Sequence, residues 1–261
     1  GITETIAADL RWLEKLAGLA EARLPALKPY RPQKLVRELA RSLNRELDLA
    51  NECRNAERIA ANMKPMPWIV VPKVHWAFTH ERINVQNRIV GIAGQQLDLL
   101  DTQGYDRSLL ARRGAHAVLK MIVEDGFFHA DPHPGNVFYL PGNAIAFIDV
   151  GMVGRLSQRR REDLLNLLLG LVERQPQSVA EVLLDWTGDE QGIHTDQLEG
   201  EIEAFVDQYY GVPLAQLSLG QMLSDVTTLL REHRLALPSD LALLIKAFIT
   251  LEGMGRGLDP S

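Results

Sequence analysis

The chain has 261 residues, of which 46% are hydrophobic, so it is long enough to bury a large core as one domain or as a two-lobed unit. Its formal net charge of -6 at pH 7 argues against a protein dedicated to nucleic-acid binding, and we expect no nucleic acid among its partners. Cys53 is the only cysteine, which excludes an internal disulfide, and the longest apolar runs are too short to cross a bilayer, so we expect no transmembrane segment.

The first part of the chain predicts two helices followed by two strands. Apolar residues recur at helical spacing from Ile6 to Leu27, and a second helix is expected to begin near Pro32 and to run to about Met63. Trp68 to Phe78 and Glu81 to Val90 alternate apolar and polar residues or cluster β-branched ones, a pattern typical of strands. Residues 1–91 are therefore predicted to form a small mixed piece.

The second part of the chain is predicted to be mainly helical. Gly91 and Gly94 flank a short linker that leads into it. One hairpin is expected inside this part, with strands at Val137 to Leu140 and Ala144 to Ile148 and a turn at Pro141-Gly142-Asn143. The fold class is thus predicted as α+β, with residues 92–261 forming a larger helical piece.

Polar residues around this hairpin have the spacing of a phosphoryl-transfer site. Asp131 and Asn136 precede the first strand, and Asp149 with Gly151 follows the second. In kinase-type centres the first Asp orients or deprotonates the acceptor, while the Asn and the second Asp hold magnesium on the nucleotide phosphates. Magnesium needs only a few hard oxygen ligands from the protein. We therefore predict Asp131 as catalytic, and Asn136 and Asp149 as ligands of Mg²⁺ on bound ATP.

Two other interpretations of these residues stay open. Asp131 and Asn136 would cap a turn rich in proline and glycine, and Asp149 would cap the next helix, with a prior of about one in four. A weaker alternative, at roughly one in twenty, is a metallohydrolase that uses His129, Asp131, His133 and Asp149. Pro132 and Pro134 argue against it, because they prevent the helix that would align both imidazoles. His129 is expected instead to pack and hydrogen-bond beneath the loop.

With these elements in place, the chain resembles the UbiB family of atypical protein-kinase-like proteins, which is associated with ubiquinone biosynthesis and isoprenoid-lipid homeostasis. The most specific matches are His129 to Asn136, Phe147 to Met152, and Glu46-Leu47-Asp48 with Glu52. The resemblance implies that Glu46 and Asp48 contact a Lys-x-Gly-Gln segment that covers the nucleotide site. It also implies that Glu52 pairs with a strand lysine that touches the phosphates.

The acidic residues are placed here on one long helix. Asp48 and Glu52 would then share a helical face, with Glu46 about a third of a turn away from Glu52. We expect this face to look into the cleft with Asp149, and an unpaired Glu52 to hold its proton to higher pH than a free carboxyl. From the residues alone, a solvated acidic face is preferred about two to one. Its balancing cations would be Arg41, Arg45 and Arg54.

Several departures from the family pattern shape the expected activity. Gln86 and Asn87 stand where the family has a Met-Glu pair on its hinge strand, which implies adenine contacts through the backbone. Ala130 replaces the Arg of His-Arg-Asp, and no Ala-Pro-Glu segment follows, so ATP hydrolysis or a small or lipid acceptor is favoured over protein phosphorylation. The family places its Lys-x-Gly-Gln segment and strand lysine before Gly1, so we expect a C-terminal portion that is a poor enzyme alone.

The implied function is an atypical kinase or ATPase that binds Mg-ATP between two lobes and supports ubiquinone or isoprenoid-lipid biosynthesis. Its implied partners are a nucleotide and lipids or ubiquinone-biosynthesis proteins, and its implied location is cytoplasmic, either free or held peripherally at the inner membrane. The alternatives are a small-molecule phosphotransferase of the aminoglycoside or choline kinase type and a nucleotide-binding pseudokinase scaffold. An amphipathic membrane contact through Leu214 to Leu230 is outweighed about four to one by core packing.

Overall fold

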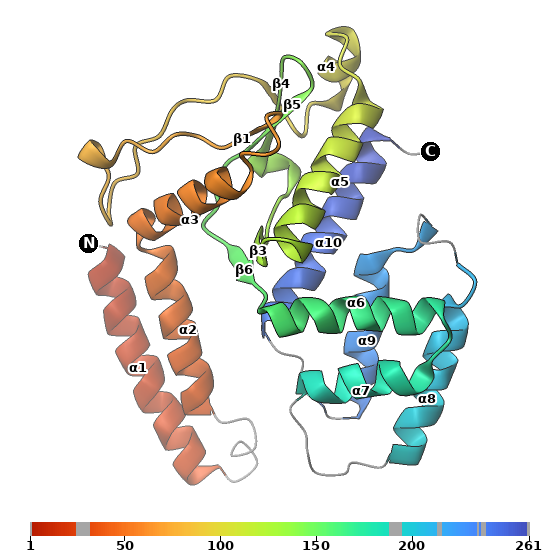
Figure 1. The fold of residues 1–261 in the computed structure, drawn as a ribbon. Coiled ribbons are helices and arrows are strands. Elements are labelled where there is room, and N and C mark those ends of the chain that lie inside the picture. The colour runs from red at the N-terminus through yellow and green to blue at the C-terminus, as the bar shows by residue number, and fades with distance from the viewer. Residues whose placement is uncertain are drawn as a thin grey trace.

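The structure is a computed structural model that describes residues 2–24, 32–187, 195–212, 216–233, 235 and 239–259. It has the predicted α+β class, with two small sheets set among helices (Figure 1). The helices are α1 Ile2–Arg23, α2 Pro32–Glu46, α3 Leu49–Asn62, α4 Leu97–Thr102, α5 Arg107–Val123, α6 Gln158–Val172, α7 Pro176–Thr187, α8 Thr195–Tyr209, α9 Leu219–Glu232 and α10 Ser239–Leu258. The strands are β1 Ile69–Val70, β2 Ile92–Ala93, β3 Phe127–His129, β4 Val137–Leu140, β5 Ala144–Phe147 and β6 Val153–Arg155.

The expected long second helix is divided in two. The α2 helix ends at Glu46 and α3 begins at Leu49, with Asp48 as its N-cap. The Asp48 carboxylate accepts hydrogen bonds from the backbone N–H groups of Ala50 (3.0 Å) and Asn51 (3.2 Å). A side-chain acceptor of this kind satisfies N–H groups that have no partner at the start of a helix. The prediction of one helix to Met63 is therefore wrong, and Asp48 and Glu52 do not share a mid-helix face.

The two expected strands between 68 and 90 are mostly irregular. Only β1 is regular, and a 3-10 helix at Trp76–Phe78 interrupts the rest. Pro72 has no N–H to give to a ladder. The hydroxyl of Thr79 accepts the N–H of Val85 at 3.1 Å, so a side chain replaces a backbone partner. The sequence pattern predicted strands that are too long. A proline or a side chain that replaces a backbone hydrogen-bond partner does not change the alternation of apolar and polar residues.

The four-stranded sheet has the order β1-β5-β4-β2 and carries the predicted hairpin, β4 and β5. β1 runs parallel to β5, and β2 runs antiparallel to β4. The linker expected between Gly91 and Gly94 is thus a strand. A Cβ on Gly94 would lie 2.5 Å from the carbonyl oxygen of Pro134, so this glycine allows β2 to approach the loop that contains Pro134. Strands from both sides of residue 91 share the sheet, and the division there stays a prediction.

The second sheet pairs β3 with β6 antiparallel and lies at the two ends of the polar loop. Phe128 faces Gly154 across the pair, and a Cβ on Gly154 would lie 2.0 Å from Cζ of Phe128. The fully buried Phe128 ring therefore requires glycine at this position. This strand pair holds the chain where it enters the loop before Asp131 and where it leaves after Met152.

The helices of the second part bury one continuous apolar core. In Figure 1, α5 and α10 lie side by side next to the four-stranded sheet, and α6 to α9 follow beyond them, with α9 packed against α10. The α9 helix buries Met222, Leu223, Val226 and Leu230, which confirms core packing for that segment over a membrane contact. Over the described ranges, no helix is both long and apolar enough to span a bilayer. From the sequence, breaks between helices are expected at Gly188 to Thr195, Gly211-Val212-Pro213 and Leu237-Pro238-Ser239, and each of these segments lies partly outside the described residues.

Candidate functional site

His129 supports the polar loop from beneath, as the sequence predicts. The side chain is fully buried, and its ring meets that of Phe147 edge-on at 6.0 Å between centroids. Its Nδ1 accepts the backbone N–H of Asp131 at 3.4 Å. Burial lowers the pKa of His129 to about 4, so the imidazole is neutral at pH 7. The histidine therefore orders the start of the loop as an uncharged hydrogen-bond acceptor.

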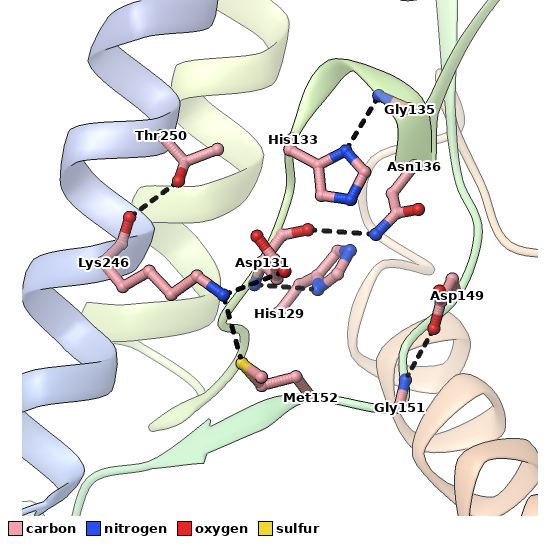
Figure 2. A network of polar contacts seen from close by, with 10 residues as sticks. All are labelled: His129, Asp131, His133, Gly135, Asn136, Asp149, Gly151, Met152, Lys246 and Thr250. Atoms are coloured by element: carbon pink, nitrogen blue, oxygen red, sulfur yellow. Dashed lines mark hydrogen bonds and ion pairs between the residues drawn. The ribbon is translucent and has the colours of Figure 1, made fainter. Parts of the chain in front are cut away.

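Asn136 ends a short 3-10 turn, Pro134–Asn136, that closes the loop. Nδ1 of His133 caps this turn by accepting the N–H of Gly135 at 3.0 Å. The Asn136 side chain is buried and donates through Nδ2 to the backbone oxygen of Asp131 at 3.2 Å. Figure 2 shows the amide oxygen turned away from Asp131. Among the described residues, no donor is bonded to this oxygen, so the turn leaves it able to accept.

Asp149 follows β5 in an uncommon backbone conformation. Its φ is 51°, in the left-handed region that is strained for residues with a Cβ. The preceding Ile148 donates its N–H to the carbonyl oxygen of Asn136 at 2.9 Å, which ties the two predicted metal-binding segments together. Oδ1 of Asp149 accepts the N–H of Gly151 at 3.4 Å. Backbone strain of this kind concentrates at functional sites.

The helix-capping interpretation of Asp149 is wrong. The next helix, α6, is capped by Ser157, whose hydroxyl accepts the N–H of Arg160 at 3.2 Å. For the metallohydrolase alternative, the described part of the chain contains no group of three His, Cys, Asp or Glu side chains placed to hold a metal ion together.

A polar cavity of about 330 Å³ collects the predicted residues. Glu52 and Asp149 also line a second hollow of about 460 Å³. Carboxylate and amide groups on the first cavity come from Asp48, Glu52, Asp131, Asn136 and Asp149. The second hollow adds Gln86 and Asn87 beside the apolar side chains of Ile89 and Phe138. The structure thus brings together residues separated by as much as 101 positions, from Asp48 to Asp149.

Glu52 faces Asp149, as expected. Burial raises the pKa of Glu52 above its ordinary value, the negative charge of Asp149 raises it further, and a hydrogen bond with Asn84 opposes both effects. Asp48 lines the same cavity but also pairs with Arg54 at 2.9 Å, so the solvated acidic interpretation holds for Asp48 in part. The side chain of Glu46 lies outside the described residues, as do those of Arg41 and Arg45.

Lys246 belongs to this site and was missed from sequence. Its Nζ lies 2.9 Å from Oδ2 of Asp131 and 3.5 Å from Sδ of Met152 (Figure 2). The only signal available was a charge directly after the apolar run Leu241 to Ile245. The spacing of apolar residues predicts a helix here, but it does not show that α10 packs against a loop 115 residues earlier in the chain.

Two family models match this chain. The family model of the ABC1 atypical kinase-like domain matches residues 1–183, and that of the UbiB helical domain matches residues 202–261. Proteins named "Probable protein kinase UbiB" are 32% identical over 263 residues in Histophilus somni and 31% identical over 265 residues in Xylella fastidiosa M12. Each alignment covers 99% of this chain and 48% of the relative, so the chain spans about half the length of these curated relatives.

A solved structure shows the same fold. The complex of Rv3197 with erythromycin from Mycobacterium tuberculosis superposes with a TM-score of 0.63 at 18% identity, covering 98% of this chain and 65% of that one. At this identity the likeness supports the fold alone. The two matched family models cover residues 1–183 and 202–261 and carry the family assignment. The chain belongs to the UbiB family of atypical kinase-like proteins.

Proposed function

We propose that this chain carries the Mg-ATP site of an atypical kinase or ATPase that supports ubiquinone or isoprenoid-lipid biosynthesis. One observation carries the proposal: Asp131, Asn136 and Asp149 line a single cavity, and Glu52 and Asp149 also line the second hollow. The family gives the biosynthetic role, and the residues give the chemistry.

The residues around Asp149 fit a magnesium ion. The amide oxygen of Asn136 and the carboxylate of Asp149 are hard oxygen donors, and both face the same cavity. The Ile148 to Asn136 backbone hydrogen bond fixes the two segments relative to each other before any ion binds. Asn136 and Asp149 would hold the ion, which would neutralise charge on the nucleotide phosphates.

The second hollow fits the base of the nucleotide. The side chains of both hinge residues are already engaged: His75 Nε2 lies 2.6 Å from Oδ1 of Asn87, and Gln86 donates to Sγ of Cys53 at 3.8 Å. Adenine would therefore be held by backbone groups and by the apolar side chains of Ile89 and Phe138. This agrees with the expectation that Gln86 and Asn87 act through the main chain.

Asp131 would accept a hydrogen bond from the acceptor hydroxyl or water and so orient it. Orientation is the main task of this carboxylate when the bond from phosphorus to the leaving group breaks ahead of the bond to the acceptor. Ala130 and the direct passage from Gly151 into β6 leave a loop without a peptide-docking segment. The acceptor we propose is water or a small or lipid hydroxyl. A peripheral location at the inner membrane follows from that lipid-linked role.

Binding and turnover test the proposal separately. Calorimetry on residues 1–261 with Mg²⁺ and the non-hydrolysable analogue AMP-PNP should detect binding, and Asp149→Asn should abolish it. Asp98→Asn is the matched control, because it removes an exposed carboxylate at the start of α4. Unchanged binding in Asp149→Asn would refute the site.

ATP hydrolysis is then compared between residues 1–261 and the complete gene product. We expect the 261-residue chain to turn over slowly, since a phosphate-binding lysine for Glu52 is not among its described contacts. Asp131→Asn should spare binding and slow hydrolysis by about 10²-fold or more. Nucleotide binding by the complete gene product without any turnover would instead support a pseudokinase scaffold.

A further inference from the structure

Lys246 joins the C-terminal helix to the residue proposed as catalytic. It holds Oδ2 of Asp131 at 2.9 Å, and its Nζ also lies 3.5 Å from Sδ of Met152. Asp131 comes two residues after β3, and Met152 directly precedes β6. The lysine thus lies where the loop leaves and rejoins its sheet, as Figure 2 shows.

The backbone of Lys246 is held firmly in place. Its helix neighbours Leu244, Ala247 and Phe248 are buried in the core, and α10 packs along α5. Close contact continues on the other side, where a Cβ on Gly220 of α9 would meet Ile249 at 2.8 Å. The lysine side chain therefore starts from a fixed point, and only its own torsions are free.

The ion pair between Lys246 and Asp131 contributes more to the orientation of the Asp131 carboxylate than to the stability of the fold. The Lys246 side chain is 44% exposed and that of Asp131 is 26% exposed, so water screens the attraction and its contribution to folding is small. An ion pair at the rim of a cavity still fixes which carboxylate oxygen is occupied. Among the described residues, no other side chain forms an ion pair or hydrogen bond with the Asp131 carboxylate.

We infer that Lys246 is a positioning residue: by holding Oδ2 of Asp131, it leaves Oδ1 free to accept the hydrogen bond of the acceptor hydroxyl or water. This inference rests on the proposed function. Orientation of the acceptor matters more than basicity in phosphoryl transfer, so a carboxylate already paired with an ammonium suits the task.

The inference makes the site a product of both matched domains. Asp131, Asn136 and Asp149 belong to the part that matches the ABC1 kinase-like domain, whereas Lys246 belongs to the part that matches the UbiB helical domain. The helical domain then supplies a side chain, Lys246, that positions Asp131.

The first test needs no nucleotide. Residues 1–261 are treated with an amine-acylating reagent, and the labelling rate of each lysine is followed by mass spectrometry. Lys246 should react several-fold more slowly than the exposed Lys64, and Asp131→Asn should raise the Lys246 rate while leaving Lys64 unchanged. An Asp131→Asn protein in which Lys246 labels at the wild-type rate would overturn the pairing.

The second test measures turnover and binding in the complete gene product. Lys246→Met should lower kcat for ATP hydrolysis by about tenfold or more while leaving the Kd for Mg-AMP-PNP within about threefold. Lys246→Arg should recover most of the loss, because it keeps a donor near Oδ2. Arg256→Met is the matched control, since it removes an exposed charge from the same helix. A double variant with Asp131→Asn should be no slower than Asp131→Asn alone.

The outcomes separate this inference from the function on which it rests. Wild-type kcat in Lys246→Met, with binding still abolished by Asp149→Asn, would overturn the role of Lys246 and leave the Mg-ATP site intact. Equal losses in Lys246→Met and Lys246→Arg, at unchanged thermal stability, would also overturn it. Loss that adds fully to that of Asp131→Asn would show that Lys246 does not act through Asp131. Binding that survives Asp149→Asn would refute the proposed function itself.

Discussion

Replacing Asp149 by glycine should stabilise the fold while abolishing Mg-nucleotide binding. Asp149 has a φ of 51°, a conformation that costs a residue with a Cβ about 1–2 kcal/mol. Glycine avoids that cost but loses about 0.5–1 kcal/mol through its greater freedom in the unfolded chain. The substitution also removes the charge that raises the pKa of Glu52. The free energy of unfolding should therefore rise by about 0.5–1 kcal/mol.

Alanine at the same position separates strain from charge. Asp149→Ala removes the same carboxylate and the same long hydrogen bond to Gly151, yet keeps the Cβ that causes the strain. Urea unfolding followed by circular dichroism should place the glycine variant about 0.5–1 kcal/mol above the alanine variant, and neither should bind Mg-AMP-PNP. Equal stability of the two variants would refute the strain argument, whatever the binding data show.

Glu52→Gln should stabilise the protein at pH 7, because the raised pKa of Glu52 means that the folded wild type weakens as this carboxyl ionises; the advantage should shrink as the pH falls from the folded-state pKa of Glu52 toward 4.5, and thermal melts from pH 4 to 8 give the trend. Gly154→Ala should destabilise by about 1–3 kcal/mol, because its Cβ would overlap the Phe128 ring, whereas Gly200→Ala in α8 should be neutral or stabilising; denaturant midpoints compare them. Asp48→Ala should cost about 1 kcal/mol through loss of the α3 cap, and a cost near zero would show that the cap is dispensable.

The elements with strong local signals were predictable. The β4 and β5 strands flank a Pro-Gly-Asn turn, and their spacing placed Asn136 and Asp149 at neighbouring ends of a hairpin. The position of His129 was also predictable. Pro132 and Pro134 exclude a helix, so His129 was expected to pack beneath the loop that contains Asp131. These parts of the site need only short-range information.

The remaining parts depend on contacts that short windows of sequence cannot contain. Asp48 stops one helix and starts another through its own side chain, which helical periodicity alone does not reveal. The β2 strand has only two residues and exists because its partner β4 lies beside it. Lys246 reaches Asp131 only after α10 has packed along α5, so its place in the site is a result of tertiary structure.

The parallel pairing of β1 with β5 sets an order for folding. Leu140 and Ala144 close their hairpin across a few residues, whereas Ile69 must find Ile145 across 76. Local pairs form early and distant ones late, because the entropy of closing a long loop must be lost first. The β4–β5 hairpin should thus form before β1 and the α3 helix pack around it. During refolding, the amides that pair β4 with β5 should gain protection from hydrogen exchange before the amide of Ile145, whose N–H is donated to the carbonyl oxygen of Trp68.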